Sequence, residues 1–268
     1  MEVIIKFVFG NNFLTMEIFS KIDSDRFGIK VGKVTEEFFY NKSTEAAIEY
    51  FFKEKFNLIL ARIDFKQISF INELEKLGFT IKDAQSTLYY DMKNKTKADL
   101  PSKFSQFDIR EFKLSDIETF VNLTRICFEG YGHYFADKRL NHNDCLDTYG
   151  DWAYNSCTNP KVADKIFVAD LNGEVIGYLS FKIYTIDDKK YAAGGIGAVN
   201  PKYRSLGVFR DVTIAGLEWG IDNGFDWEEH NVLADNFPVN KSFIKLGFKP
   251  EKFIVTLHGW VDELKRKL

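Results

Sequence analysis

The chain has 268 residues, of which 45% are hydrophobic, with a formal net charge of −3 and a pI near 5.9. Such a chain is long enough for one large or two modest domains. Its slightly acidic balance argues against nucleic-acid binding, for which a basic domain is expected. No apolar run reaches the ~18 residues of a membrane helix, and the N-terminus shows no signal-peptide pattern.

The aromatic and cysteine contents indicate the kind of fold and the redox state of the thiols. The 27 Phe and 12 Tyr suit the packing of a β-rich fold. The 3 cysteines are odd in number and lack metal-ligand spacing. We therefore expect reduced thiols in a cytoplasmic protein, and no metal site.

A polar stretch marked by Pro101 separates two patterned regions of the chain. Such stretches are typical of connections between domains. We predict a first domain over residues 1–95, a linker over 96–105 and a second domain over 106–268.

The second region predicts the element order β-α-α-β-β-β-α-β-α-β, in which an antiparallel meander gives way to a parallel β-α-β unit. Ser115 and Glu118 form a capping box that opens the first helix. Asn172-Gly173 is the strongest short hairpin signal. The predicted elements are a strand over 107–112, a loop over 129–144, a helix over 145–157, strands over 165–170, 174–184 and 191–199, a helix over 207–222, a strand over 227–234, a helix over 236–246 and a strand over 248–260.

The first region contains an echo of this ending. The segment 60–64, a helix, the segment 76–79 (KLGF) and a strand to Asp91 parallel the segment 233–236, a helix, the segment 245–248 (KLGF) and the last strand. One interpretation is two ordinary helix stops. The other is a degenerate half-copy of the same fold, used for support or dimer contacts.

The segment 198–210 predicts an anion-binding turn. It consists of a strand end, a basic loop with Gly207 and the start of a helix, with Arg204 and Arg210 on its flanks. N–H groups that open a helix lack intrahelical partners, and the helix dipole adds partial positive charge there, which suits a pyrophosphate. The alternative is a loop without a ligand, because such connections are common. Neither nucleotide motif, G-x-x-x-x-G-K-[ST] or G-x-G-x-x-G, is present.

Gly194, Gly195 and Gly197 lie inside the strand before this turn. Glycines weaken a strand unless another backbone or a ligand approaches closely. We expect the strands on either side of the long helix to splay apart and to admit a long, thin ligand.

With these features in place, the second region resembles a GNAT-superfamily N-acetyltransferase. The cofactor loop of that family follows Q/R-x-x-G-x-G/A, and Arg204, Gly207 and Phe209 occupy its first, fourth and sixth positions. Asn236 and the helix end at 246–248 match a second family motif. The resemblance implies an α+β fold with a mixed sheet, the GNAT acyl-CoA N-acyltransferase fold, with an N-terminal degenerate half-GNAT domain.

The resemblance also implies an enzyme that transfers the acetyl group of acetyl-CoA directly to a primary amine. Over its length the chain resembles the dTDP-fucosamine acetyltransferase group, with shared features at 24–28, at 61–79 and at Tyr149, Trp152 and Asn155. The expected acceptor is therefore the amino group of a nucleotide-linked amino-deoxy sugar. A small-molecule amine, including a dTDP-sugar, is the expected partner. Nucleic acid and membrane are not expected, and a homodimer is left open.

The implied site lies around the splayed strands. The N–H of Val199 is the candidate donor to the thioester oxygen. Candidate proton carriers are Glu229, His230 and His258. Glu229 and His230 lie on opposite faces of one strand, so we expect one of them to face the cleft and the other to be structural. A lone histidine in a strand, such as His258, is more often packed or solvated than catalytic. Expected cofactor contacts are Gly197, Ala198, Val199, Arg204, Ser205, Leu206, Gly207, Val208, Phe209, Arg210, Asn236 and Phe243.

The acceptor pocket is expected in the loop 129–144 and the following helix. Aromatic faces there suit stacking on a sugar or base, and Arg139 is expected to meet a diphosphate. The alternative is a polar surface loop with buried rings. The candidate acceptor contacts are Tyr131, His133, Tyr134, Arg139, Tyr149 and Trp152.

Two residues depart from the family pattern. The sixth loop position is usually small, so the side chain of Phe209 is predicted to turn into the core. Phe243 stands where the family often has a tyrosine that protonates the leaving thiolate, and phenylalanine cannot donate a proton. Because a thiol has a pKa of about 8.5, water or Ser242 is an alternative donor.

Two other functions stay open. One is an N-acetyltransferase for another small amine, such as an aminoglycoside, a polyamine or an amino acid. The other is a non-catalytic acyl-CoA-binding protein, which Phe209 and Phe243 favour.

Overall fold

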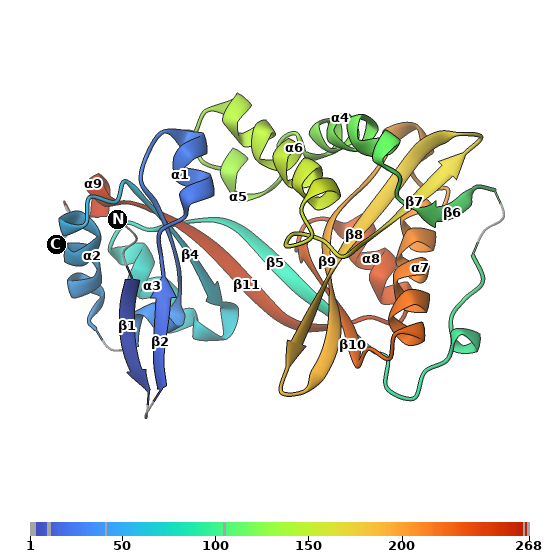
Figure 1. Cartoon of the computed structure of the whole chain (residues 1–268). Helices are drawn as coiled ribbons and strands as arrows, with labels where there is room; N and C mark the ends of the chain where they lie inside the picture. The colour runs from blue at the N-terminus through green and yellow to red at the C-terminus, as the bar shows by residue number, and fades with distance from the viewer. Residues whose placement is uncertain (1–3, 10–11, 41, 104–105, 265, 267–268) are drawn as a thin grey trace. The chain divides into compact units, whose positions relative to one another are not determined.

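The computed structural model describes residues 4–9, 12–40, 42–103, 106–264 and 266. It contains two compact units, which we call unit 1 (residues 1–85, 132–144 and 252–268) and unit 2 (86–131 and 145–251) (Figure 1). Strands β5 (Thr80–Asp91) and β11 (Lys249–Trp260) each begin in one unit and end in the other.

The predicted domains 1–95 and 106–268 follow one another in sequence, whereas the compact units interleave. Compactness alone does not define independently folding domains, so these domain boundaries stay a prediction. Residues 104 and 105 of the predicted linker lie outside the described residues.

Unit 1 contains a mixed sheet with a buried apolar face. Its elements are β1 (Ile4–Phe9), β2 (Asn12–Glu17), α1 (Lys21–Phe27), β3 (Val31–Thr35), α2 (Thr44–Lys53), β4 (Leu58–Asp64), α3 (Ile68–Lys76), the first half of β5, α5 (Gly132–Phe135), the end of β11 and α9 (Val261–Leu264). β3 pairs in parallel with β4, and β4 pairs antiparallel with β11. Ile59, Ala61 and Ile63 alternate along β4 and are fully buried among side chains of α2 and α3.

Unit 2 contains the meander and the parallel strand pair. Its elements are β6 (Asp108–Glu111), α4 (Ile117–Phe128), α6 (His142–Thr158, from Cys145 on), β7 (Lys165–Leu171), β8 (Glu174–Ile186), β9 (Lys189–Val199), α7 (Val208–Asp222), β10 (Trp227–Leu233) and α8 (Phe237–Lys245), with the second half of β5 beside β10. β6, β7, β8 and β9 pair antiparallel in this order, and β10 joins β9 in parallel. The predicted order of elements is confirmed apart from the short helix α5, which follows α4 in the chain.

Helices cover both faces of this sheet. Tyr178 on β8 stacks on Phe120 of α4, with ring centroids 3.9 Å apart. Phe181, three residues on and therefore on the other face, lies directly against Gly216 of α7. β9 and β10 thus belong to a sheet packed between α4 and α7, and the loop 200–207 connects β9 to α7.

The hairpin prediction is confirmed, and one helix-cap prediction is wrong. Asn172 and Gly173 have φ values of 54° and 89°, the left-handed conformation that a two-residue hairpin requires. Ser115 does not cap α4. Instead the carboxylate of Asp116 accepts the N–H of Lys113 at 2.8 Å and pairs with Arg110, and α4 begins at Ile117. A charged acceptor held by an arginine is stronger than a serine hydroxyl.

The predicted loop over 129–144 is also partly helical. It contains α5 and the first turn of α6, which begins at His142 and not at Cys145. Gly130 and Gly132 have φ values of 74° and 76°. These left-handed positions end α4 and allow a new helix to start within a few residues.

The echo between the two halves extends to hydrogen bonding. After α3, Gly78 N donates to Glu75 O at 3.0 Å and Phe79 N donates to Leu74 O at 3.0 Å. After α8, Gly247 and Phe248 make the same bonds, to Ile244 O at 3.0 Å and to Phe243 O at 3.1 Å. Helices that end in glycine commonly make these bonds, so the shared geometry fits both the half-copy and two ordinary helix stops.

Candidate active site around the separating strands β9 and β10

The predicted splay between β9 and β10 is confirmed. The two strands pair only at their beginnings, from Trp227↔Tyr191 to Glu229↔Ala193. Beyond these pairs β9 continues to Val199 and β10 to Leu233 without pairing to each other. The facing edges therefore carry backbone groups that the sheet does not use.

A β-bulge shapes β9 where it leaves β10. Leu179 pairs with Gly197 and Phe181 pairs with Gly194, so that Ser180 alone opposes two residues of β9. The Ser180 hydroxyl donates to the carbonyl of Ile196 at 3.0 Å. Bulges bend a strand and re-aim its backbone groups.

The N–H of Val199 points away from β8. Asn200 N donates to Ile176 O of β8 at 2.8 Å. Because successive N–H groups in a strand point to opposite edges, Val199 N–H is directed toward the edge from which β10 has separated. This orientation is the one that the predicted carbonyl contact needs.

The turn into α7 retains the predicted anion-binding geometry. No side chain caps α7, whose N-cap is Gly207 with φ 85°, and Ser205 also has a positive φ of 68°. The first-turn N–H groups are therefore not paired within the helix, and the dipole adds positive charge. Consecutive turns of this kind direct N–H groups into one concavity. The residues fit the diphosphate of a coenzyme A molecule.

The side chains around the turn divide in their roles. Phe209 packs edge-on against Phe243, with ring centroids 5.2 Å apart, so its predicted turn into the core is confirmed. Arg204 is exposed, and its Nη2 lies 3.7 Å from Sγ of Cys127, whose thiol donates to Val199 O at 3.3 Å. The Arg210 side chain pairs with Asp211 and donates to Ser102 O at 2.6 Å, so its predicted role as a flanking cation gains no support from these contacts and stays a prediction. Its main-chain N–H still opens α7.

Glu229 and His230 lie on opposite faces of β10, as predicted. Glu229 is half-buried, and its Oε2 accepts the indole N–H of Trp227 at 3.2 Å. His230 is 4% exposed, and its Nε2 lies 2.7 Å from Oε1 of Glu228, which is fully buried. Burial raises the pKa of Glu228, and the bond to His230 opposes this rise.

His258 belongs to a different cluster, inside unit 1. Its Nδ1 lies 2.6 Å from Oδ2 of Asp137, and its Nε2 lies 2.9 Å from Nδ1 of His133. Asp137 also accepts the indole N–H of Trp260 at 3.0 Å. His258, Asp137 and His133 are all buried. We assign this cluster a structural role in unit 1, and the catalytic role of His258 gains no support from its contacts.

The predicted acceptor residues fall in both units. Tyr131, Tyr149 and Trp152 belong to unit 2, where the Tyr149 hydroxyl donates to Tyr131 O at 2.7 Å. In unit 1, the predicted diphosphate ligand Arg139 lies 3.7 Å from the centre of the Trp260 ring. It also pairs with Asp262 and Glu263, which leaves the expected diphosphate contact without support. His133 and Tyr134 are buried there as well.

Sequence reasoning missed two residues of the site. Glu228 precedes His230 by two positions, and the period of a strand could have identified it as the neighbour on the same face. Asn240 carries no such signal. Its Nδ2 donates to Leu233 O at 2.8 Å, its Oδ1 accepts the Ser86 hydroxyl at 2.7 Å, and it thereby ties α8 to the end of β10. The predicted contact Asn236 forms the N-cap of α8.

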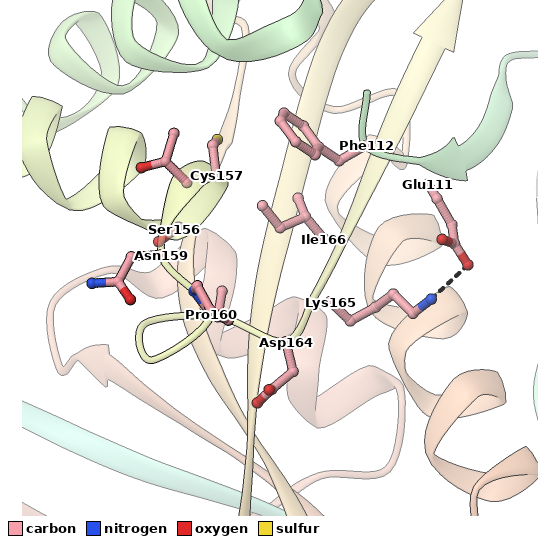
Figure 2. Close-up of a pocket in the computed structure, with 11 residues that line it drawn as sticks. Glu111, Phe112, Ser156, Cys157, Asn159, Pro160, Asp164, Lys165 and Ile166 are labelled. Atoms are coloured by element: carbon pink, nitrogen blue, oxygen red, sulfur yellow. Dashed lines mark hydrogen bonds and ion pairs between the residues drawn. The ribbon is translucent and has the colours of Figure 1, made fainter. Parts of the chain in front are cut away.

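A surface pocket of about 280 Å³ lies elsewhere in unit 2, at the end of α6 and the start of β7 (Figure 2). Its charged groups are paired: Lys165 bonds to Glu111 at 2.6 Å, and Asp164 bonds to Lys182 at 2.9 Å. Burial raises the pKa of the Cys157 thiol in its wall to about 12. The pocket therefore offers no reactive or unpaired charged group and is not part of the predicted site.

Three further observations concern the chain as a whole. Cys127, Cys145 and Cys157 do not form disulfide bonds. Within the described ranges no group of His, Cys, Asp and Glu side chains is arranged to hold a metal ion. Every helix in these ranges is too short or too polar to span a bilayer.

The strand order and the separating strands are those of the GNAT acyl-CoA N-acyltransferase fold. Residues 123–248 match the model of the Acetyltransferase (GNAT) family. The predicted fold is confirmed, and the match of this segment to a family of acetyltransferases agrees with the predicted enzyme class, N-acetyltransferase. No curated protein matches the chain in sequence.

Solved structures share the fold at low sequence identity. A tandem GNAT protein from the clavulanic acid biosynthesis pathway is 16% identical, with a TM-score of 0.55 over 81% of this chain and 68% of that one. A GCN5-related N-acetyltransferase from Kribbella flavida is 14% identical, with a TM-score of 0.54 over 80% and 72%. A protein of unknown function from Staphylococcus epidermidis is 13% identical, with a TM-score of 0.52 over 87% and 84%. The tandem relative agrees with an additional N-terminal half-domain here.

Proposed function

We propose that the chain transfers an acetyl group from acetyl-CoA to a small primary amine. The observation that carries this proposal is the separation of β9 from β10 immediately before the uncapped start of α7. The free edge of β9 would pair with the pantetheine arm like an added strand, and the N–H groups from Ser205 to Arg210 would hold the diphosphate. The cofactor supplies an activated thioester.

The residues of the chain have distinct tasks in this proposal. The N–H of Val199 donates to the thioester carbonyl oxygen as negative charge develops on it. Arg204 adds positive charge near the diphosphate. Alignment of amine and thioester by itself supplies several kcal/mol. Glu229, on the face opposite His230, accepts the proton that the amine loses, directly or through one water.

The acceptor expected from the family resemblance is a nucleotide-linked amino sugar. This finer proposal depends on Tyr149 and Trp152 in unit 2 and on the loop that precedes them. Tyr149 stacks on Phe128 at 4.8 Å, and Trp152 is 41% exposed and therefore available to a ligand. A cytoplasmic location belongs to the same proposal, since nucleotide sugars are made there.

One observation favours the second candidate, another small amine. Burial raises the pKa of the Tyr89 hydroxyl, and the nearby carboxylates of Asp91, Glu251, Asp226 and Glu229 raise it further, so negative charge lies near Tyr89. Such a surface attracts a cationic amine and repels a nucleotide diphosphate.

A thiol-release assay with acetyl-CoA tests the proposed function. The panel contains a dTDP-amino-deoxyhexose, an aminoglycoside, a polyamine and an amino acid. We expect thiol release with at least one of them. Tight binding of dTDP by calorimetry supports the sugar nucleotide, and preferential use of polyamine or aminoglycoside supports the second candidate. Binding of acetyl-CoA without release for any amine would favour a non-catalytic acyl-CoA-binding protein.

A further inference from the structure

Four aromatic side chains form a row across one face of the sheet in unit 2. Tyr184 of β8, Tyr191 of β9 and Trp227 of β10 occupy directly paired positions, and Tyr89 of β5 lies beside Trp227. Consecutive ring centroids are 5.4, 4.4 and 6.0 Å apart. Because the four strands are neighbours in the sheet, the rings form one uninterrupted row.

The row lies beyond the helix that covers this face. Tyr178, six residues earlier on β8 and therefore on the same face, is fully buried against α4. Tyr184 is 48% exposed, and Figure 1 shows the hairpin of β8 and β9 extending away from α4. Within the described residues the hydroxyls of Tyr89, Tyr184 and Tyr191 form no hydrogen bond. The row is therefore open to solvent, at the opposite end of β9 from Val199.

Carboxylates surround one end of the row. Asp91 follows Tyr89 by two residues on β5 and so shares its face. The pKa of the Tyr89 hydroxyl is raised first by burial and then by the charges of four nearby carboxylates, those of Asp91, Glu251, Asp226 and Glu229. We define the acidic aromatic patch as the four rings of the row together with Asp91, Asp226 and Glu251.

The carboxylates of the patch lack an ion-pair partner within the described residues. Asp91 and Asp226 accept main-chain N–H groups, at 2.9 and 2.8 Å. The lysines of the neighbouring strands do not neutralise them. Lys182 forms an ion pair elsewhere at 2.9 Å, Lys190 projects from the opposite face, and Lys189 belongs to the β8–β9 turn at the other end of the row.

Folding alone does not account for this arrangement. Aromatic pairs across neighbouring strands stabilise a sheet, but carboxylates that gather without cations repel one another and lower stability. A cation from outside the chain would remove this cost. Tyrosine and tryptophan are enriched at the centres of protein interfaces. The row extends over four strands, whereas sites for small molecules are concave, so these features favour a protein partner with basic side chains.

We propose that the acidic aromatic patch binds an arginine-bearing segment of a partner protein. A guanidinium group bonds to carboxylates through a fork of donors and also stacks on aromatic rings, so arginine matches both parts of the patch better than lysine does. The patch lies at the opposite end of β9 from the cofactor turn. The inference therefore goes beyond the proposed acetyl transfer and does not depend on it.

The test uses the full chain without coenzyme A and a synthetic peptide of alternating arginine and serine. In an extended chain such a peptide presents its arginines on one side. Fluorescence anisotropy of the labelled peptide measures the affinity, and NMR follows the indole N–H of Trp227. We expect a Kd of about 0.1 mM or below at low salt, and a loss of about tenfold in affinity between ~20 and ~200 mM salt, with saturable shifts of the indole signal.

Substitutions test the two parts of the patch separately. Glu251→Lys reverses a charge and should weaken peptide binding about tenfold, and Tyr184→Ala removes an exposed ring and should weaken it about threefold. Glu118→Lys, at an exposed carboxylate of α4, is the matched control and should bind the peptide as the wild type does. Because Glu251→Lys relieves repulsion among carboxylates, it should not lower the midpoint of thermal unfolding. Glu229 stays unchanged, because it belongs to the proposed site of acetyl transfer.

Three results would overturn the inference. The first is equal affinity of the peptide for the wild type and Glu251→Lys, or no binding at about 1 mM peptide. The second is binding of spermidine that is tighter than that of the peptide and is lost in Glu251→Lys, which would assign the patch to a small polyamine. The third is self-association of the chain that Glu251→Lys abolishes, which would assign it to a second copy. Each result leaves the proposed acetyl transfer to its own assay.

Discussion

The contact between Gly194 and His230 yields the most direct stability prediction. Gly194 does not have a positive φ, so alanine suits its backbone, but the added Cβ would lie 1.8 Å from Nδ1 and 2.1 Å from Cε1 of the ring. Ordinary non-bonded contacts are about 3.5 Å. In Gly194→Ala the ring must therefore shift by ~1.5 Å or more, which breaks its 2.7 Å bond to Glu228.

The expected cost follows from these contacts. Overpacking costs about 1–3 kcal/mol, and a buried charged group that loses its partner costs about 3–5 kcal/mol. Because the ring can partly relax, we expect Gly194→Ala to lower the free energy of unfolding by about 3–5 kcal/mol. His230→Ala should cost a similar amount, because it also leaves Glu228 without its partner. The double variant should cost little more than His230→Ala alone, since the new Cβ enters the vacated space.

Urea unfolding followed by Trp fluorescence measures this cycle, since Trp152, Trp219 and Trp227 all belong to unit 2. We expect a coupling free energy of at least ~2 kcal/mol between the two positions. Additive effects, within about 0.5 kcal/mol, would show that the ring does not lie against Gly194.

Three further predictions concern the cofactor turn, unit 1 and the hairpin. Arg204→Glu should weaken coenzyme A binding about ten- to thirtyfold in calorimetry, because it reverses a charge beside the diphosphate. The control Lys189→Glu, in the distant β8–β9 turn, should bind coenzyme A as the wild type does. Equal affinities of Arg204→Glu and the wild type would contradict the cofactor assignment. Burial lowers the pKa of both His133 and His258, so the unfolded state takes up protons below pH ~6.5 that the folded state does not. The free energy of unfolding should therefore be unaffected by these histidines above that pH. As the pH falls below it, the free energy should decrease by up to ~1.4 kcal/mol per pH unit for each histidine. A urea midpoint that does not change from pH 7.5 to 5.5 would be inconsistent with the burial of His133 and His258. Gly173→Val, at φ 89°, should cost about 1–2 kcal/mol in thermal unfolding, whereas Asn172→Gly should be nearly neutral.

The sequence predicted the architecture of unit 2 well, for local reasons. The hairpin at Asn172-Gly173, the helix stop at Gly247 and the glycine at the start of α7 depend on backbone conformations that few residues adopt, and each is where it was predicted. The helix cap failed at Ser115 because Asp116 is held by Arg110, a partner that capping rules do not consider.

The candidate site was predicted less completely. The splay and the inward turn of Phe209 follow from glycines and from a steric argument, and both are seen in the structure. The pairing of Glu228 with His230 depends on burial under α8, and the engagement of Arg139 by acidic side chains depends on contacts between segments far apart in the sequence. Single-sequence patterns carry no information on such contacts.

Amide-resolved NMR during a coenzyme A titration tests whether the edge of β9 and the start of α7 hold the cofactor. We expect saturable shifts at the amides of Val199 and of Ser205–Arg210, with heat of binding in a parallel calorimetric titration. An absence of binding, or shifts confined to other residues, would contradict this assignment.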